Sequence, residues 1–321
     1  MRLTGSGGRR RLETDMNFKG CGTALVTPFR RDGAVDEAAL RELVQWQVES
    51  GIDLLIPCGT TGEASTLSEE EWLRVTELTV EAAAGRVPVF AGCTHNSTAE
   101  AVLRAKKLAR VAGLTGILTA NPYYNRPGQE GQYRHFRAIA EAVGIPLLLY
   151  NIPGRTGTNL EPATALRLVR DCGNVVGIKE SSGNIAQITE LITRIANEGP
   201  QGFAVFAGDD SMALPVLALG GVGLISVASN VIPAEMAQMV QCGLGGDWAE
   251  ARRLNARWFR LMQAHFSEPS PAPVKAVLAM IGRGEDVLRL PMVPVTDGTR
   301  ARLEELATQL GLVQTAATAT R

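Results

Sequence analysis

The sequence predicts an α/β fold in which eight strands alternate with helices, a (β/α)8 TIM barrel, with a C-terminal helical extension. Two observations predict it: eight short apolar runs recur along the chain, and amphipathic segments lie between them. Most runs are continuous rather than alternating, as expected of strands that are buried on both faces. The runs are residues 22–28, 53–58, 87–92, 115–120, 145–151, 175–180, 203–208 and 222–227.

Helix-start signals support the segments between these runs. The segment 36–50 begins at Asp36, an acidic N-cap, and keeps its leucines and valines on one face. In the next two segments, Ser68 and Ser97 are each followed three residues later by a glutamate, the pattern of a capping box. Both segments end at a glycine, which favours helix termination. These are the first three predicted helices of the barrel.

The main alternative is a doubly wound open sheet. That fold usually carries a G-x-G-x-x-G turn after its first strand, whereas the first run here ends in Thr27, Pro28 and Phe29. After about residue 240 the strands stop, and three helical segments follow at 247–266, 272–282 and 298–310. We therefore expect a disordered tail at 1–16, the barrel at 17–242, the helical region at 243–312 and a frayed end at 313–321.

Composition excludes several classes of protein. Of the 321 residues, 45% are hydrophobic and 20% charged, which allows a sizeable globular core, and the net charge of -1 gives no reason to expect nucleic acid as a partner. No apolar stretch approaches the roughly 20 residues of a membrane span, and the first sixteen residues lack a secretory apolar segment. The five cysteines form no C-x-x-C pair, which argues against a zinc site or disulfides and fits the cytoplasm.

One lysine occupies the position where this fold places its chemistry. Active sites of (β/α)8 barrels lie at the C-terminal ends of the strands, and of the five lysines only Lys179 ends a predicted strand. Lysine, unlike arginine, can lose its proton when it is buried, and the neutral amine can then attack a ketone to form a Schiff base. The alternative is a strand-end lysine paired with a carboxylate. Position alone favours neither.

Other strand ends carry polar groups, each of which also has a purely structural interpretation. Tyr150 could transfer protons near a Schiff base or pack at the rim, and the GTTGE loop at 59–63 could hold a carboxylate or form a tight turn. Arg155 could bind a second carboxylate or simply lie at the surface. Asp209 and Asp210 have no neighbouring histidine, so we expect them to cap a helix rather than bind a metal.

Together these motifs resemble the pyruvate-dependent class I lyases of the dihydrodipicolinate synthase and N-acetylneuraminate lyase superfamily. The resemblance covers about residues 18–312, and the motifs are GTTGEASTLSEEE, NPYYNRPGQEG, YNIPGRTG, VVGIKESSG, FAGDDSMALP and EPSPAPVK. Within the superfamily the chain is similar to the dihydrodipicolinate synthase family. Its second loop is GTTGE, where neuraminate lyases typically replace the first threonine by serine, and its fifth loop carries Arg155, which relatives that act on sugar acids usually lack.

The resemblance implies a lyase that condenses pyruvate with L-aspartate 4-semialdehyde to 4-hydroxy-tetrahydrodipicolinate in lysine (diaminopimelate) biosynthesis, without a metal or an organic cofactor. It implies that Lys179 forms the Schiff base and that Tyr150 is the general acid and base. It further implies that Thr61 links Tyr150 to Tyr124, which enters from the neighbouring subunit of a tight dimer. Two such dimers usually form a homotetramer in this family.

The resemblance also assigns the binding residues. The backbone of Thr60 and Thr61 would hold the pyruvate carboxylate, Arg155 the carboxylate of the semialdehyde, while Gly208 and Ile225 supply carbonyl oxygens. A candidate regulatory lysine site comprises Ala64, Ser65, Glu69, Trp72, Asn96, Glu100 and Tyr123. Its residues 69 and 72 are often histidine in inhibited enterobacterial forms, and their identity here weakens the expectation of feedback inhibition.

Two alternative functions remain at this stage. The first is another pyruvate-dependent 2-oxo-acid aldolase or dehydratase of the same superfamily, against which Arg155 argues. The second is a non-enzymatic binding barrel, against which the presence of Lys179, Tyr150 and Thr61 argues.

Overall fold

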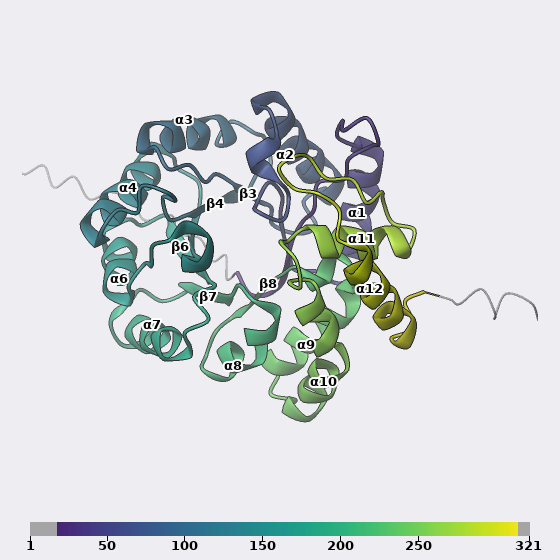
Figure 1. The fold of residues 1–321 in the computed structure, drawn as a ribbon. Helices are drawn as coiled ribbons and strands as arrows, with labels where there is room; N and C mark the ends of the chain where they lie inside the picture. The colour runs from purple at the N-terminus through teal and green to yellow at the C-terminus, as the bar shows by residue number, and fades with distance from the viewer. Residues whose placement is uncertain (1–17, 314–321) are drawn as a thin grey trace, which may run out of the picture.

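The computed structural model describes residues 18–313, so the predictions for 1–16 and for nearly all of 313–321 lie outside the described residues. Eight parallel strands form one sheet in the order β2-β1-β8-β7-β6-β5-β4-β3, and a parallel bridge between Leu55 and Val89 joins β2 to β3 (Figure 1). The predicted (β/α)8 barrel is confirmed. The strands are β1 (Gly20–Ala24), β2 (Leu54–Ile56), β3 (Phe90–Gly92), β4 (Gly116–Ala120), β5 (Leu147–Asn151), β6 (Val175–Glu180), β7 (Ala204–Ala207) and β8 (Gly223–Ser226).

Helices surround the strands as a ring (Figure 1). Its members are α1 (Glu37–Glu49), α2 (Glu69–Ala83), α3 (Thr98–Leu108), α4 (Gln129–Ala142), α6 (Pro162–Asp171), α7 (Ile185–Glu198), α8 (Ala213–Ala218) and α9 (Pro233–Leu244). Short helical turns follow four strands: η1 (Ala64–Thr66), α5 (Pro153–Thr156), η2 (Asp210–Met212) and η3 (Ala228–Asn230). They shape the loops at the C-terminal ends of the strands.

The predicted helix starts are mostly correct. Asp36 accepts a hydrogen bond from Ala39 N at 3.0 Å, and Ser68 forms a complete capping box with Glu71. At α3, Ser97 accepts from the backbone of Glu100, which is the first half of the predicted box. Side-chain oxygens thus satisfy amide groups that a helix start would otherwise leave unpaired.

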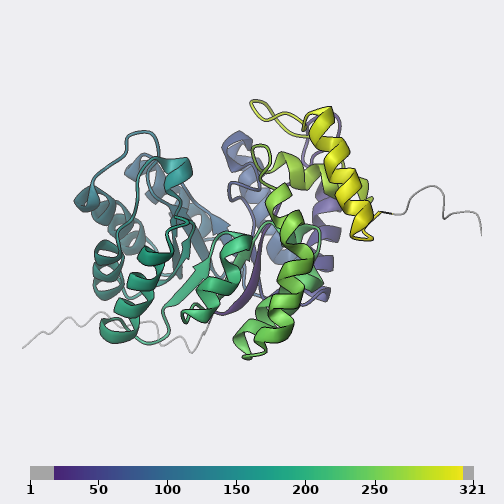
Figure 2. The same cartoon turned by 60° about the horizontal axis from the view of Figure 1, so that its bottom comes forward.

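The C-terminal extension consists of α10 (Trp248–Ala264), α11 (Ala272–Met280) and α12 (Asp297–Gln309). These helices lie on one side of the barrel, next to α9 and α1, in both views (Figures 1 and 2). Since α9 ends at Leu244, the expected boundary at 242/243 falls within its last turn. The connection from α11 to α12, residues 281–296 (here the C-terminal segment), passes over α2 (Figure 1).

The apolar core has two layers. The outer layer fills the space between strands and helices, and the inner layer fills the barrel with side chains such as Leu54, Leu148 and Phe206. Phe18, just before β1, packs edge-on against Phe90 with ring centroids 5.0 Å apart. These aromatic side chains close the N-terminal end of the barrel, and the loops at the opposite end are those that carry active sites in this fold.

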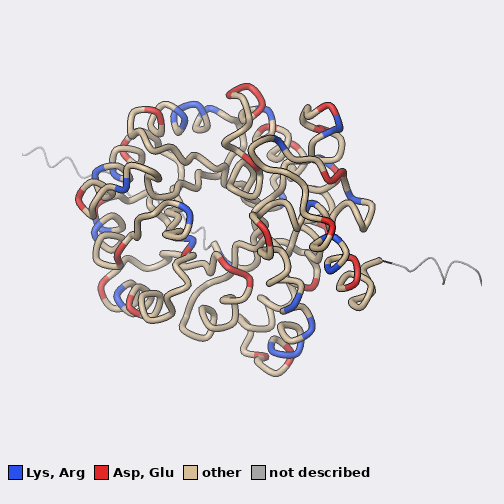
Figure 3. Tube along the Cα trace, viewed as in Figure 1, with Lys and Arg blue, Asp and Glu red and all other residues tan. Residues whose placement is uncertain are grey.

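Charged residues are distributed around the whole trace. Basic and acidic positions alternate along the outer helices, with no face of one sign in this view (Figure 3). No helix within residues 18–313 combines the length and the apolar character that crossing a membrane requires.

Candidate active site

Lys179 lies at the C-terminal end of β6, and its side chain is only 5% exposed. It is in register with Tyr150 on β5, and its Nζ lies 4.5 Å from the centroid of the Tyr150 ring. In the described part of the chain, lysine ion pairs occur at Lys107 and Lys275 and not at Lys179. The interpretation of Lys179 as a strand-end lysine paired with a carboxylate therefore fails.

Gly208 makes room for the lysine side chain. A Cβ atom at this position would lie 2.9 Å from Lys179 Cγ, 3.0 Å from Lys179 Cε and 1.9 Å from Ser181 Oγ. The backbone N–H of Gly208 also donates to Glu180 O at 2.8 Å, which fixes the turn after β7. Only glycine allows the aliphatic stem of Lys179 to lie this close to the neighbouring strand end. Ile225, on β8, is fully buried.

The GTTGE loop follows β2 and is fixed on two sides. Thr61 is 6% exposed, whereas Thr60 is exposed. Thr27, which follows β1, donates its hydroxyl to Gly62 O at 2.7 Å. Glu63 adopts a left-handed backbone with φ of 51°, a conformation that a non-glycine residue holds only under constraint. The loop is thus a rigid turn with one threonine open to the barrel mouth.

A buried ion pair lies behind this loop, and the sequence analysis missed it. Lys275 Nζ lies 2.5 Å from Glu63 Oε1, and both side chains are 2% exposed. Burial lowers the pKa of Lys275, against the opposing effect of the Glu63 charge. Both residues belong to motifs that the sequence displays, GTTGE and EPSPAPVK, but nothing in their spacing joins positions 212 residues apart.

A cavity of about 530 Å³, here the mouth cavity, opens beside these strand ends. Among the predicted residues, Thr60, Tyr150 and Arg155 line it, and Lys179 adjoins it through Tyr150. Arg155 is exposed on α5 and donates to Ser270 O at 3.5 Å. Four further lining residues were not predicted: Thr94 and His95 after β3 and Arg104 on α3, which belong to no motif, and Ile152, which lies in the YNIPGRTG motif.

The loop that carries Arg155 is supported from the outer side of the strands. Successive strand residues point to opposite faces, so Asn151 and Glu180 face away from the lysine. Asn151 Nδ2 donates to Glu180 Oε2 at 3.0 Å and to Asn159 Oδ1 at 2.9 Å, and its Oδ1 accepts from Leu160 N at 2.9 Å. Burial raises the pKa of the Glu180 carboxyl. These bonds tie the loop after β5 to the end of β6.

The two aspartates after β7 have different structural roles. Asp209 accepts from Ser211 N at 2.8 Å and caps η2, as predicted. Asp210 instead accepts from Val227 N and Ala228 N at 3.2 Å and 3.0 Å, which holds the loop after β8. Burial raises the pKa of Asp210 to about 6. Within residues 18–313, no group of three or more histidine, cysteine, aspartate or glutamate residues is arranged to hold a metal ion.

Comparison with known proteins identifies the family. The sequence profile described as the Dihydrodipicolinate synthetase family matches residues 17–310. The chain belongs to this family. A relative from Acidobacterium capsulatum, named 4-hydroxy-tetrahydrodipicolinate synthase, is 59% identical over 298 residues, which cover 93% of this chain and 97% of the relative.

Solved structures of the same family share the fold. The chloride-inhibited dihydrodipicolinate synthase from Acinetobacter baumannii, complexed with pyruvate, matches with a TM-score of 0.88 and 39% identity, covering 92% of this chain and 99% of that chain. The synthase from Cyanidioschyzon merolae with lysine bound matches with the same TM-score, identity and coverage. The predicted resemblance is therefore confirmed over nearly the whole described chain.

Tyr124, which the family resemblance assigns to a proton relay, lies outside the mouth cavity of its own chain. It follows β4, is 89% exposed and has a φ of 71°. A bulky residue in this left-handed region is uncommon. The predicted link from Thr61 to a Tyr124 of the neighbouring subunit stays a prediction.

The candidate regulatory site of the family overlaps the mouth cavity in part. Four of its residues line that cavity: Ala64, Ser65, Trp72 and Tyr123. Trp72 is 3% exposed and donates its Nε1 to Gly92 O at 2.9 Å, while Glu69 forms an ion pair with Lys107. Asn96 and Glu100 lie at the start of α3. The two positions that depart from the family pattern are thus engaged by contacts within the chain.

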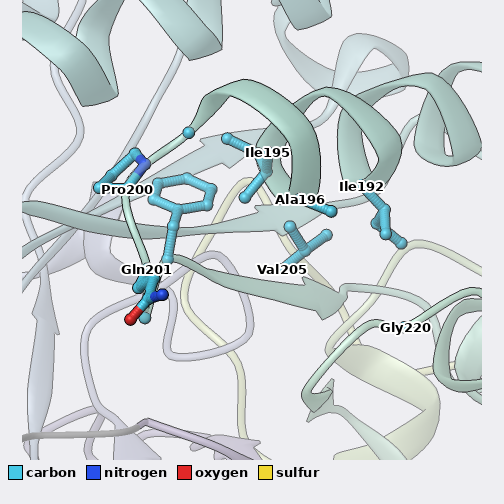
Figure 4. Close-up of a pocket in the computed structure, with 10 residues that line it drawn as sticks. Ile192, Ile195, Ala196, Pro200, Gln201, Val205 and Gly220 are labelled. Carbon is cyan, nitrogen blue, oxygen red and sulfur yellow. The ribbon is translucent and has the colours of Figure 1, made fainter.

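A second cavity, of about 290 Å³, lies where α7 leads into β7 (Figure 4). Its lining includes Ile192, Ile195, Pro200 and Val205, and none of its ten lining residues is titratable. It is at the N-terminal end of the strand, opposite the mouth cavity. This position and lining distinguish it from the active site of the synthase family.

Proposed function

We propose that this chain condenses pyruvate with L-aspartate 4-semialdehyde to 4-hydroxy-tetrahydrodipicolinate, through a Schiff base on Lys179. One observation carries the proposal: a buried lysine amine without an ion-pair partner in the described chain lies against Tyr150 beside the mouth cavity. The name of the Acidobacterium relative supports the reaction, and the pyruvate complex of the Acinetobacter enzyme supports the first substrate.

The first half of the reaction loads pyruvate onto the enzyme. The neutral Lys179 amine attacks the C2 carbonyl of pyruvate, and the carbinolamine loses water to give an imine. The Tyr150 hydroxyl donates the proton that the leaving water needs and accepts one from the amine. The backbone of Thr60 and Thr61 holds the pyruvate carboxylate, and the rigid turn around them keeps the carbonyl carbon near the amine.

The second half joins the two substrates. A proton leaves the methyl carbon of the imine, and the resulting enamine forms a carbon–carbon bond with the aldehyde carbon of the semialdehyde. Arg155 binds the semialdehyde carboxylate, for which its planar guanidinium suits a bidentate contact. The amino group of the semialdehyde then attacks the imine carbon and displaces Lys179, which closes the ring. The lysine amine activates pyruvate throughout, so the reaction needs neither a metal nor an organic cofactor.

The proposed assembly is a homotetramer built from two tight dimers. Exposed Tyr124 and its neighbour Tyr123, which lines the mouth cavity, support an interface at this edge. In such a dimer Tyr124 of each subunit would complete the relay from Thr61 to solvent in its partner. We place the protein in the cytoplasm, which is supported by its five cysteines, all within residues 18–313 and none of them in a disulfide.

Reductive trapping tests the proposal. Treatment with borohydride in the presence of pyruvate should leave a reduced pyruvyl adduct on Lys179, read by mass spectrometry of the peptide. Absence of the adduct would rule out the Schiff-base mechanism. A coupled assay with L-aspartate 4-semialdehyde then identifies the second substrate. An adduct without condensation would favour another 2-oxo-acid aldolase of the superfamily.

The same assay tests the candidate regulatory site. The lysine-bound relative supports a site of this kind, whereas the pairing of Glu69 and the burial of Trp72 oppose it. If these contacts exclude the ligand, saturating lysine leaves the rate unchanged.

A further inference from the structure

We propose that Glu63 and Lys275 are positioning residues: through them the C-terminal extension sets the conformation of the GTTGE loop and hence the affinity for pyruvate. This inference rests on the proposed function, because it assigns a task to the residues behind the proposed carboxylate-binding backbone. Neither side chain would touch the substrate. Both would act through Thr60 and Thr61.

The Glu63 carboxylate is held at both oxygens. Its Oε1 accepts from Lys275 Nζ at 2.5 Å, and its Oε2 accepts from the backbone N–H of Arg289 at 3.1 Å. Glu63 is two residues after Thr61 and has the left-handed φ of 51°. A side chain fixed at both oxygens fixes the backbone from which it projects. The strained conformation at the end of the loop therefore depends on contacts from the far end of the chain.

Lys275 is an equally fixed partner. It lies on α11, donates to Val287 O at 2.9 Å, and its Nζ is 4.2 Å from the centroid of the Phe29 ring. The ammonium group thus has three neighbours: the Glu63 carboxylate, the Val287 carbonyl oxygen and the face of the Phe29 ring. Since both side chains are 2% exposed, bulk solvent and its ions screen the attraction within the pair only weakly.

A second clamp extends the same connection to the neighbouring loops. The Arg289 guanidinium donates to Gly33 O at 2.9 Å and 2.7 Å, to Thr66 O at 2.9 Å, and to both carboxylate oxygens of Glu71 at 2.6 Å and 2.5 Å. The C-terminal segment therefore joins the loop after β1 to the start of α2. Figure 1 shows this segment crossing α2.

The chemistry of the pair points to geometry rather than to stability. A buried ion pair adds little net stability, because desolvation of both charges offsets their attraction, and apolar side chains of similar size often serve as well. What the pair provides is a single relative position for two segments. A loop that binds a carboxylate through its backbone needs that precision, since displacements of about 1 Å can cost up to about 100-fold in activity.

The test removes both charges together, so that neither is left buried alone. The double variant Glu63→Gln, Lys275→Met keeps side-chain volume close to the original. We expect the KM for pyruvate, and the pyruvate concentration that half-saturates borohydride trapping, to rise by about tenfold or more while kcat stays within about threefold. The matched control is Leu303→Ala on α12, a core residue that is 2% exposed. It should lower the unfolding midpoint and leave the KM for pyruvate unchanged.

The outcomes separate this inference from the proposed function. A wild-type enzyme without a Lys179 adduct overturns both. A wild-type enzyme that forms the adduct, with a double variant of unchanged pyruvate affinity, overturns the positioning role alone. If the double variant does not fold, Glu63→Asp decides, because it keeps both charges and shortens the side chain by one methylene group, so that the carboxylate reaches Lys275 and the Arg289 N–H only if the loop backbone moves. A raised KM then supports the role, and an unchanged KM overturns it.

Discussion

Lys179 and Lys275 are both buried lysines, with 5% and 2% exposure, yet their surroundings differ. In the C-terminal extension, the Lys275 charge meets Glu63, a backbone carbonyl and an aromatic ring. At the barrel mouth, the Lys179 amine meets the Tyr150 ring and has no ion-pair partner within residues 18–313. Burial alone therefore does not distinguish a nucleophile. The proposed nucleophile differs in being a buried amine without a counter-charge, at a strand end.

The largest effect is expected when the charge at residue 179 is kept and its chemistry is removed. Lys179→Arg should abolish condensation, with a loss of at least about 10⁴-fold in kcat, because a guanidinium does not deprotonate and forms no Schiff base. Trapping with pyruvate should give no adduct. The control is Lys106→Arg, an exposed lysine on α3, which should retain full activity. Residual turnover within about tenfold of wild type would remove the lysine from the mechanism.

The second prediction compares how much each buried lysine contributes to the free energy of unfolding. Lys275→Met leaves the Glu63 carboxylate buried and unpaired, so we expect a loss of about 3–5 kcal/mol in the free energy of unfolding. Lys179→Met leaves no counter-charge behind, and its free energy of unfolding should stay within about 1 kcal/mol of wild type. Urea denaturation of both variants measures the difference. Equal losses would mean that Lys179 has a partner that the structure does not show.

Most of the fold could be predicted from the sequence because its signals are local. Eight apolar runs gave eight strands, and Ser68 and Asp36 cap helices as their spacing indicates. The first strand is the exception: the run 22–28 was expected, but β1 spans Gly20–Ala24. Leu25 and Val26 continue the apolar pattern beyond the strand because they pack in the outer core. An apolar run in the sequence indicates which residues are buried, and residues can stay buried beyond the point where strand pairing ends.

The site could be predicted only in part. Lys179 and Tyr150 lie on adjacent strands, so fold and register brought them together once each was placed at a strand end. The Glu63–Lys275 pair could not be found in this way, since it depends on how α11 packs against the barrel. Likewise His95, after β3, and Arg104, on α3, belong to no motif and line the mouth cavity through tertiary packing alone. The roles assigned to the site residues stay predictions: Lys179, Tyr150, Thr61, Tyr124 and Arg155.

The third prediction concerns the Tyr150 hydroxyl at the barrel mouth. Tyr150→Phe keeps the ring against Lys179 and removes the hydroxyl that we assign to proton transfer. We expect kcat to fall by about 10²-fold, the lower range for general acid–base catalysis, while the pyruvyl adduct still forms at a reduced rate. Quenching with borohydride at successive times after pyruvate is added measures the rate of adduct formation separately from turnover. An unchanged kcat would leave Tyr150 a packing residue beside the nucleophile.

The fourth prediction concerns a buried group without a partner that lies away from the mouth. His265, at the end of α10, is fully buried, and neither ring nitrogen has a hydrogen-bond partner in the described structure. Burial lowers the pKa of His265 from 6.5 to about 3. The unfolded chain therefore binds more protons between these values, and stability falls as the pH falls below 6.5. From pH 7 to pH 5 this histidine alone should cost about 2 kcal/mol in the free energy of unfolding.

In His265→Leu that part of the pH dependence should disappear, which urea titrations at the two pH values can measure. The pyruvate kinetics should stay unchanged. His135, whose pKa burial lowers to about 4, remains in this variant and accounts for a residual slope. If the free energy of unfolding of His265→Leu depends on pH as strongly as that of wild type, then His265 is not an unpartnered buried group. Lys179 would then have no counterpart of this kind in the C-terminal helices.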